Sequence, residues 1–433
     1  MKFGGTSVGD AQSIRQVVQV VQEHLAQRPV VVVSAHAGVT DALLDVARRA
    51  PTGDADTSAV AARHRRILRD LDLPEDLLDA LLGELQDLAR GLRLVGSASA
   101  QAQDLLASFG ERCSARVVAA ALRQAGVPST AVDAFTAGLR TDSSFGRARP
   151  LPDDGRIAAH IANVEGVPVV TGFIAADEQG RITTLGRNGS DYSAALFGVA
   201  LAAAEIQIWK SVDGVRTADP RLVPAALPIR DMSFDEACEL ASFGSQVLHP
   251  AAMVPAMQRG IPLRVRNTLD PAAPGTTIEA DAVSGRPAVR AISHRPDVAL
   301  ASVTSQRFLP QHVFLARVFA ELAELHCDVG PVAVSEACVT FAIHGAAAPA
   351  AALALAALGE VAVIEGQAVV GVVGAPGAIE ARVAGDVLST LAAAGIVVRC
   401  ASQGARGSTI AFVVAGSDLA AAVALLHERF FRA

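Results

Sequence analysis

Hydrophobic positions over the first 285 residues alternate between two spacings. Residues 30–33 form a short apolar run (VVVV) typical of a buried parallel strand, whereas residues 57–95 carry leucine at helical spacing with charged partners. Residues 115–125 are also helical and stop at Gly126. Further apolar strands are predicted at 130–134, 167–174, 181–185, 205–209 and 261–266. This alternation predicts an α/β domain with a largely parallel sheet, in which ligands bind at the carboxyl ends of the strands.

The pattern changes near residue 285, where the polar stretch from Asp281 to Pro296 is predicted to be a linker. Two similar units follow it. The first has a strand at 298–304, a helix at 312–326, strands at 332–335 and 337–343, and a helix at 346–358. The second has strands at 361–365 and 368–373, a helix at 378–394, strands at 396–401 and 408–414, and a helix at 418–431. Such an internal repeat predicts regulatory or dimerising modules that carry no chemistry.

Composition excludes several classes of protein. The net charge of −7 argues against a general binder of nucleic acids or membrane surfaces, which would present a basic face. No apolar stretch has the length and character of a membrane span, and the N-terminus lacks a signal-peptide core, so we expect a cytoplasmic chain. The five cysteines are scattered and are expected to be reduced thiols. Only two of the 37 basic residues are lysine, Lys2 and Lys210.

Two glycine-containing loops are candidates for anion binding. The segment Lys2-Phe3-Gly4-Gly5 has paired glycines, a lysine and following hydroxyl groups, which favours phosphate binding, although the same glycines also fit a simple tight turn. The second loop, residues 185–191, precedes a helix predicted at 191–203. Ser190 is a plausible N-cap with Asp191 in the first turn, and Arg187 is placed to bind a carboxylate.

Other segments are interpreted as structural. Residues 210–221 form a long loop after strand 205–209. Ser233 and Glu236 form a capping box at the start of a helix, and His249, beside a proline, is interpreted as a structural hydrogen-bonding residue. The glycines of residues 371–377 have the wrong spacing for a dinucleotide motif and predict a turn.

Taken together in this order, the motifs resemble those of the aspartokinases, amino-acid kinases with C-terminal tandem ACT domains. The resemblance rests on KFGGTSV (2–8), VVVSAHAGVTD (31–41), FGE (109–111), LGRNGSDYSAA (185–195), VDGVRTADPR (212–221), FGSQVLHPA (243–251), IPLRVRNT (261–268), PGTTI (274–278), and the regulatory segments within 303–336 and 402–404. It implies a three-layer α/β sandwich with a mainly parallel sheet at 1–285. It also implies two α+β, ferredoxin-like ACT domains at 298–433, divided at about 298–358 and 361–433 and able to interlace.

The resemblance also implies roles for residues. Lys2 and Asp191 would be catalytic, with Asp191 orienting Lys2. Residues expected to bind L-aspartate are Ser34, Thr40, Glu111, Arg187, Asn188, Gly189 and Ser190, with Arg187 on the α-carboxylate and Glu111 on the α-ammonium group. Residues expected to bind ATP are Lys2, Phe3, Gly4, Gly5, Lys210, Ser211, Arg216, Arg221, Gln246 and Val247. Mg²⁺ would arrive with ATP and need no ligand from the protein, and a homodimer or larger homo-oligomer would form through the ACT domains.

Several positions depart from the family pattern. Lys210-Ser211 stands where Thr-Asp is usual, Arg216 where tyrosine is usual, and Gln246 where lysine is usual. All belong to the nucleotide half of the site. We therefore weigh an active aspartate kinase against a catalytically impaired relative with a regulatory or binding role. Lys210 either supplies the phosphate-binding charge that Gln246 lacks or points to solvent in a decayed site.

The expected effector pocket of the ACT domains also departs from the family. Val313 and Gly330 replace the usual glycine and aspartate there. An effector amine would find no carboxylate partner at Gly330, so weak or absent inhibition by lysine is expected.

Overall fold

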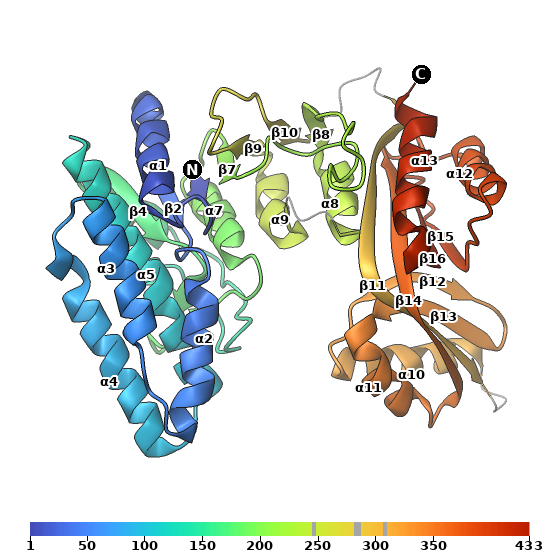
Figure 1. Cartoon of the computed structure of the whole chain (residues 1–433), viewed down its shortest axis with the longest axis horizontal. Coiled ribbons are helices and arrows are strands. Elements are labelled where there is room, and N and C mark those ends of the chain that lie inside the picture. Colours follow the sequence, from blue (N-terminus) through green and yellow to red (C-terminus); the bar gives the residue numbers. More distant parts are fainter. Residues whose placement is uncertain (245–247, 281–286, 306–309, 433) are drawn as a thin grey trace. The chain divides into compact units, whose positions relative to one another are not determined.

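A computed structural model describes residues 1–244, 248–280, 287–305 and 310–432 of the chain. The chain forms two compact units (Figure 1). The first comprises Met1–Val215 and His249–Ala280, and the second comprises Arg216–Leu248 and Asp281–Ala433.

The first unit is built on a mainly parallel sheet. Its strands are β1 (Lys2–Phe3), β2 (Val31–Val33), β3 (Ser129–Val132), β4 (Val167–Thr171), β7 (Ile206–Lys210), β9 (Leu263–Asn267) and β10 (Thr276–Glu279). They are arranged in the order β3-β4-β2-β1-β7-β9-β10, and only β10 runs antiparallel to its neighbour β9. The short first strand β1 therefore lies between β2 and β7, with Lys2 opposite Val32 and Ile208.

Helices cover both faces of this sheet, which gives the three layers that the resemblance implies (Figure 1). One layer contains α1 (Ala11–Glu23), α2 (Val39–Arg49), α3 (Ser58–Asp70), α4 (Asp79–Val95) and α5 (Ala100–Gln124). The other contains α7 (Gly189–Ala200) and α9 (Pro250–Arg259), which contact each other. The helix α6 (Arg156–Ala162) and the hairpin β5 (Ile174–Ala176) and β6 (Ile182–Thr184) complete the unit. An apolar cluster joins α1–α5 to the sheet through residues such as Phe3, Val31 and Trp209.

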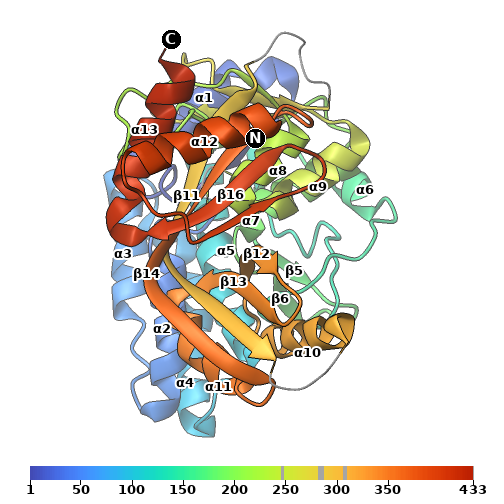
Figure 2. The same cartoon turned by 90° about the vertical axis from the view of Figure 1, so that its right-hand side faces the viewer.

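The second unit contains an antiparallel sheet in the order β12-β13-β11-β14-β16-β15. Its strands are β11 (Val289–Ser305), β12 (Val329–Val334), β13 (Cys338–His344), β14 (Gly359–Gly374), β15 (Cys400–Gln403) and β16 (Thr409–Ala415). Its helices are α10 (Gln311–Glu324), α11 (Ala348–Leu355), α12 (Ala381–Ala393) and α13 (Leu419–Phe431). Figure 2 shows the long strands β11 and β14 running from the part beside α12 and α13 to the part beside α10 and α11. Each part has its own apolar core.

A short segment from the middle of the chain belongs to this second unit. It includes β8 (Asp231–Ser233) and α8 (Phe234–Ser242), and α8 contacts β11 and β14. The Glu239 carboxylate accepts hydrogen bonds from the Ser408 and Thr409 hydroxyl groups, at 3.1 and 3.0 Å. By packing, residues 216–248 therefore group with the C-terminal residues, whereas the sequence division placed them within 1–285. The spacing of neighbouring residues in the sequence does not indicate contacts between residues so far apart in the chain.

Several predicted elements need correction. The strands predicted at 361–365 and 368–373 form the single strand β14, in which Gly366 has a φ of +66° without ending the strand. The predicted linker is part of β11 from Val289 onward, where residues 289 and 291–295 pair with β14. Residues 371–374 of the predicted turn are the buried end of β14, and residues 371–373 pair with β16. The helix predicted at 115–125 begins at Ala100.

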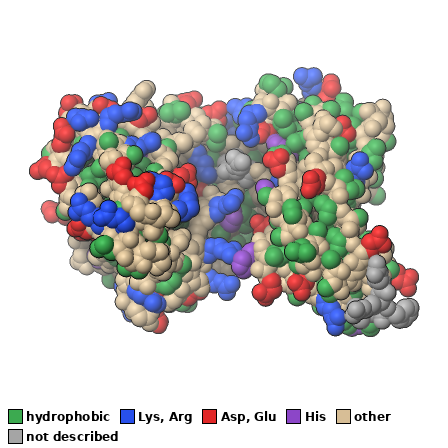
Figure 3. All heavy atoms as spheres, turned by 60° about the horizontal axis from the view of Figure 1, so that its bottom comes forward, with side chains coloured by type: hydrophobic (Ala, Val, Ile, Leu, Met, Phe, Trp, Pro, Cys, Tyr) green, Lys and Arg blue, Asp and Glu red, His purple; other side chains and the backbone are tan. Residues whose placement is uncertain are grey.

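Two local predictions are confirmed. Ser233 and Glu236 form a reciprocal capping box at the start of α8. The His249 side chain caps α9 by accepting a hydrogen bond from the backbone N–H of Ala251. Both acidic and basic side chains are present on the face shown in Figure 3. Among the described residues, no helix is long and apolar enough to cross a membrane.

Candidate functional site

The candidate site lies where the parallel strands β1, β2 and β7 end. Residues Gly4–Val8 follow β1, and residues 34–38 follow β2. The backbone N–H of Gly4 donates to the carbonyl of Trp209 on β7, and that of Ala37 donates to the carbonyl of Gly5. A Cβ at Gly5 would lie 3.1 Å from the carbonyl oxygen of Ala35. A side chain at this position would require the two loops to move apart by a few tenths of an ångström, so glycine favours their close approach.

Two ammonium groups meet one carboxylate at this edge of the sheet. Lys2 Nζ lies 2.6 Å from Oδ1 of Asp191, and Lys210 Nζ lies 3.2 Å from Oδ2 of the same residue. Burial alone would raise the pKa of Asp191, but the charges of Lys2 and Lys210 hold it below its usual value. Burial, aided by the charge of Lys2, lowers the pKa of Lys210. Lys210 is thus turned toward Asp191 and does not point to solvent, whereas its role in binding the nucleotide stays a prediction.

Glu111 is a buried carboxyl group on α5. Its Oε1 accepts a hydrogen bond from the backbone N–H of Ala35 at 3.1 Å, and its Oε2 has no hydrogen-bond partner among the described residues. Burial raises the pKa of Glu111 to about 8. The helix approaches closely at Gly110, where a Cβ would lie 2.7 Å from that of Ala35. A buried acid with a free oxygen is suited to bind a cation.

The loop before α7 differs in detail from the prediction. Asn188 occupies the N-cap with a φ of +57°, and no side chain caps the helix. Ser190 as the N-cap is therefore wrong, because α7 begins at Gly189 and Ser190 lies inside its first turn, buried against Gly172. Arg187 is exposed in this loop and forms no ion pair within the described ranges.

Asp104 supports this loop from α5, a role that the sequence analysis missed. Its carboxylate accepts hydrogen bonds from the backbone N–H groups of Gly146 and Thr184 and from the Thr184 hydroxyl group, each at 2.9 Å. Burial nevertheless raises its pKa. The partners lie 42 and 80 residues away, so no sequence pattern indicates the contact.

The remaining predicted site residues differ in burial and in the unit to which they belong. Phe3 is buried in the sheet, Ser34 and Thr40 are half-buried near the end of β2 and the start of α2, and Ser211 is exposed. Arg216 and Arg221 belong to the second unit, where Arg216 donates to the carbonyl of Ala226 and Arg221 pairs with Asp219. Their roles stay predictions. Gln246 and Val247 lie outside the described residues.

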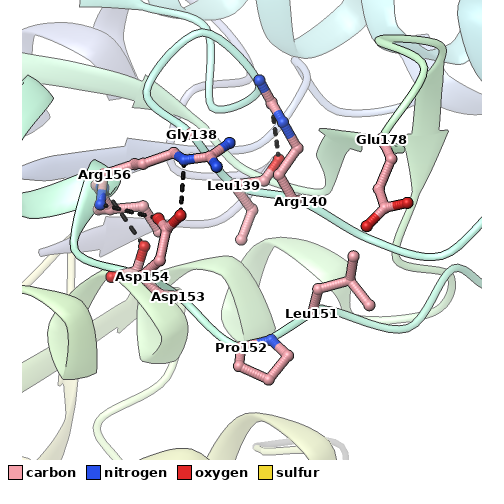
Figure 4. A pocket seen from close by; sticks show the side chains of 10 residues that line it. Gly138, Leu139, Arg140, Leu151, Pro152, Asp153, Asp154, Arg156 and Glu178 are labelled. Atoms are coloured by element: carbon pink, nitrogen blue, oxygen red, sulfur yellow. Dashed lines mark hydrogen bonds and ion pairs between the residues drawn. The ribbon is translucent and has the colours of Figure 1, made fainter.

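A separate hollow of about 540 Å³ lies in the first unit (Figure 4). It is lined by Gly138, Leu139, Arg140, Leu151, Pro152, Asp153, Asp154, Arg156, Ile157 and Glu178. None of the predicted site residues lines it. Figure 4 shows Arg156 beside Asp154, with which it forms an ion pair. Among the described residues, no group of three or more His, Cys, Asp or Glu side chains is arranged to hold a metal ion.

Comparison with known proteins identifies related chains. Residues 1–267 match the amino acid kinase family, and residues 368–430 match the ACT domain. The chain is 33% identical to chloroplastic aspartokinase 1 of Arabidopsis thaliana over 462 aligned positions, covering all of this chain and 80% of that protein. It is also 33% identical to lysine-sensitive aspartokinase 3 of Escherichia coli, covering 99% of this chain and 98% of that protein.

Solved structures give the same result. The structure of E. coli aspartokinase III in complex with aspartate and ADP (R-state) matches with a TM-score of 0.85 and 32% identity, covering 99% of both chains. The structure of the same enzyme with lysine and aspartate (T-state) matches with a TM-score of 0.81. Similarity of this extent, over the kinase and ACT regions alike, shows that the chain belongs to the aspartokinase family.

Proposed function

We propose that this chain is an aspartate kinase that transfers the γ-phosphoryl group of ATP to the side-chain carboxylate of L-aspartate, forming 4-phospho-L-aspartate and ADP. The observation that carries the proposal is the placement of two opposite binding groups at one sheet edge. The ammonium groups of Lys2 and Lys210 lie beside the glycine loop, and the buried Glu111 has a free carboxyl oxygen. The two ammonium groups suit a polyphosphate, and the Glu111 carboxylate suits the α-ammonium group of an amino acid.

Glu111 would bind the substrate amine in its ionised form. Because burial raises the pKa of Glu111 to about 8, the empty site holds a proton over much of the neutral range. An incoming ammonium group would favour the carboxylate and displace that proton. Arg187, exposed in the loop before α7, would bind the α-carboxylate through its guanidinium fork. Ser34, Thr40 and the backbone at Gly189 would complete this half of the site.

The reaction would need no general base. The side-chain carboxylate of aspartate is already ionised at neutral pH, so one of its oxygens can attack the γ-phosphorus directly. The bond from phosphorus to the β,γ-bridging oxygen breaks, and ADP leaves with the electron pair. The chain would contribute positioning and stabilisation of the phosphoryl charge by Lys2, which Asp191 orients.

Mg²⁺ would enter as part of the nucleotide substrate and neutralise phosphate charge. The donor set fits this assignment, because the described side chains at the site are mainly cationic and Asp191 is already paired with two lysines. Amino-acid biosynthesis, including that of lysine and threonine, is the pathway class that the family implies. We also propose that the ACT domains mediate homo-oligomer formation.

The test is an assay of the purified chain with L-aspartate, ATP and Mg²⁺. Hydroxylamine traps the acyl phosphate as a hydroxamate, and coupled enzymes measure ADP. We expect hydroxamate and ADP in equal amounts with L-aspartate, and neither with L-glutamate. Binding of aspartate and ADP by calorimetry without any turnover would instead support a catalytically impaired relative.

A further inference from the structure

The two lysines of the chain converge on one carboxylate. Lys2 is on β1 and Lys210 ends the neighbouring strand β7, so a separation of more than 200 residues is closed by strand pairing. All other basic residues apart from histidine are arginines. A lysine offers a compact ammonium group on a flexible stem, which can exchange partners more readily than a guanidinium fork.

The charges at this point do not balance. Asp191 carries one negative charge and contacts two ammonium groups. Lys2 alone, at 2.6 Å, satisfies the need of the buried carboxylate for a counter-ion. The nearby Glu111 adds little negative charge, because burial raises its pKa to about 8. Among Lys2, Lys210, Asp191 and Glu111 the positive charge therefore exceeds the negative charge, and a partly buried excess charge favours an anionic ligand.

Lys210 is the more movable of the two lysines. Its side chain is 20% exposed, against 7% for Lys2, and its ammonium group is farther from Asp191. Its backbone is fixed, because its carbonyl accepts a hydrogen bond from the backbone N–H of Thr268 at 2.7 Å. The side chain can thus turn from Asp191 to a ligand while the strand stays in place.

The glycine loop lies directly beside Lys210. The backbone N–H of Gly4 donates to the carbonyl of Trp209, the residue before Lys210. A Cβ at Gly4 would lie 3.6 Å from Lys2 Nζ, so the loop backbone passes close to the first ammonium group. A phosphate chain bound at this loop would meet Lys2 from β1 and Lys210 from β7.

We propose that Lys210 binds the nucleotide phosphates, and that Asp191 holds its ammonium group until the nucleotide enters. This inference rests on the proposed function, since it assigns a residue to the nucleotide half of that site. A purely structural Lys210 would remain on Asp191 in both states. A phosphate-binding Lys210 would contribute a charge-assisted contact to ADP and ATP alike and would contribute none to aspartate.

The test uses Lys210→Met and Lys210→Gln in the full chain. The glutamine amide can still donate a hydrogen bond to Asp191 but lacks the charge, which separates the ionic role from the structural one. We expect the dissociation constant for ADP, measured by calorimetry, to rise about 10- to 100-fold in both variants. The KM for ATP should rise in parallel, while the KM for aspartate should stay within about twofold of the original value.

Arg264→Ala is the matched control. Arg264 also carries one positive charge, but on β9, opposite Gln207 and away from the end of β7, where it forms an ion pair with Glu205. Its removal should leave ADP binding unchanged. ADP affinity within twofold of the original in Lys210→Gln would overturn the proposal, as would an equal rise in both KM values. If the unaltered chain itself bound no ADP, the nucleotide part of the proposed function would fail as well, which distinguishes the two failures.

Discussion

Glu111 accepts a hydrogen bond from the backbone N–H of Ala35 through one carboxyl oxygen and leaves the other oxygen without a partner among the described residues. This hydrogen bond joins α5 to the loop after β2, the loop that also approaches the paired glycines. The free oxygen is buried, so a cationic ligand would bring it an interaction that water does not supply.

The pH dependence of aspartate binding follows from this carboxyl group. Burial raises the pKa of Glu111 to about 8, so the group is largely protonated below that pH and must release its proton to bind an ammonium group as an anion. We expect the KM for aspartate to fall as the pH rises from 6.5 to 8 and then to level off. Kinetics across this range should show no such dependence in Glu111→Gln, together with a higher KM. The same pH profile in both proteins would contradict the assignment.

Removal of the guanidinium group of Arg187 should impair recognition of aspartate. We expect Arg187→Ala to lower kcat/KM for aspartate by about 10- to 100-fold, the effect of removing a hydrogen bond between charged groups of about 1.5–3 kcal/mol. Because Arg187 is exposed, the melting temperature should hardly change. Arg66→Ala, at an exposed position on α3, is the control and should behave as the original chain. Unchanged aspartate kinetics in Arg187→Ala would remove Arg187 from the site.

Two buried histidines should make the chain less stable in mild acid. The rings of His36 and His64 lie 5.2 Å apart, and each Nδ1 contacts a backbone carbonyl group. Burial, with the neighbouring His64 and Arg63, lowers the pKa of His36 to about 3, and burial also lowers that of His64. Both rings stay neutral in the folded chain while the unfolded chain takes up protons near pH 6.5. The free energy of unfolding is therefore highest, as far as these histidines contribute to it, above pH 6.5, and it decreases as the pH falls below that value.

For His36 the free energy of unfolding should fall by about 1.4 kcal/mol per pH unit below pH 6.5, down to its lowered pKa of about 3. His64, whose pKa is also lowered, should add to the loss in the same direction. Urea unfolding between pH 8 and pH 5 measures it. His36→Asn, whose amide can replace the Nδ1–H donor to the Val8 carbonyl, should show a shallower decline. A decline as steep as that of the original chain would show that His36 is not responsible.

Inhibition by lysine should be weak or absent. The resemblance places the effector pocket near Val313 on α10 and Gly330 on β12, and neither residue supplies a carboxylate for an effector amine. A Cβ at Gly330 would lie 3.3 Å from that of Ala342, so a side chain fits there only if its neighbour yields. We expect millimolar lysine to leave the kinase activity of the full chain unchanged. Calorimetry that detected micromolar lysine binding would refute this.

The sequence predicted whether a segment is a helix or a strand more reliably than it predicted the residues at which each element begins and ends. Most strands of the first sheet and the glycine loops were recognisable because apolar runs and glycines act locally, whereas β10 was not predicted. β14 was divided in two because Gly366 resembles a turn, and only pairing with β11 and β16 shows that the strand continues. The burial of Lys210 against Asp191 likewise depends on the order of strands in the sheet, which local spacing does not contain.

The paired strands β11 and β14 give the second unit a mechanical property. Their ladder runs from Val289 opposite Gly374 to Ser305 opposite Gly359, and each strand takes part in both halves of the sheet. The two halves of the sheet are therefore connected by two continuous paired strands and not by a flexible linker. Twisting one half against the other requires bending these two strands or breaking the hydrogen bonds between them. The register shifts between Val289 and Leu300 are the positions at which the strands bend most easily. A force applied to either half is transmitted to the other as torsion of the same two strands.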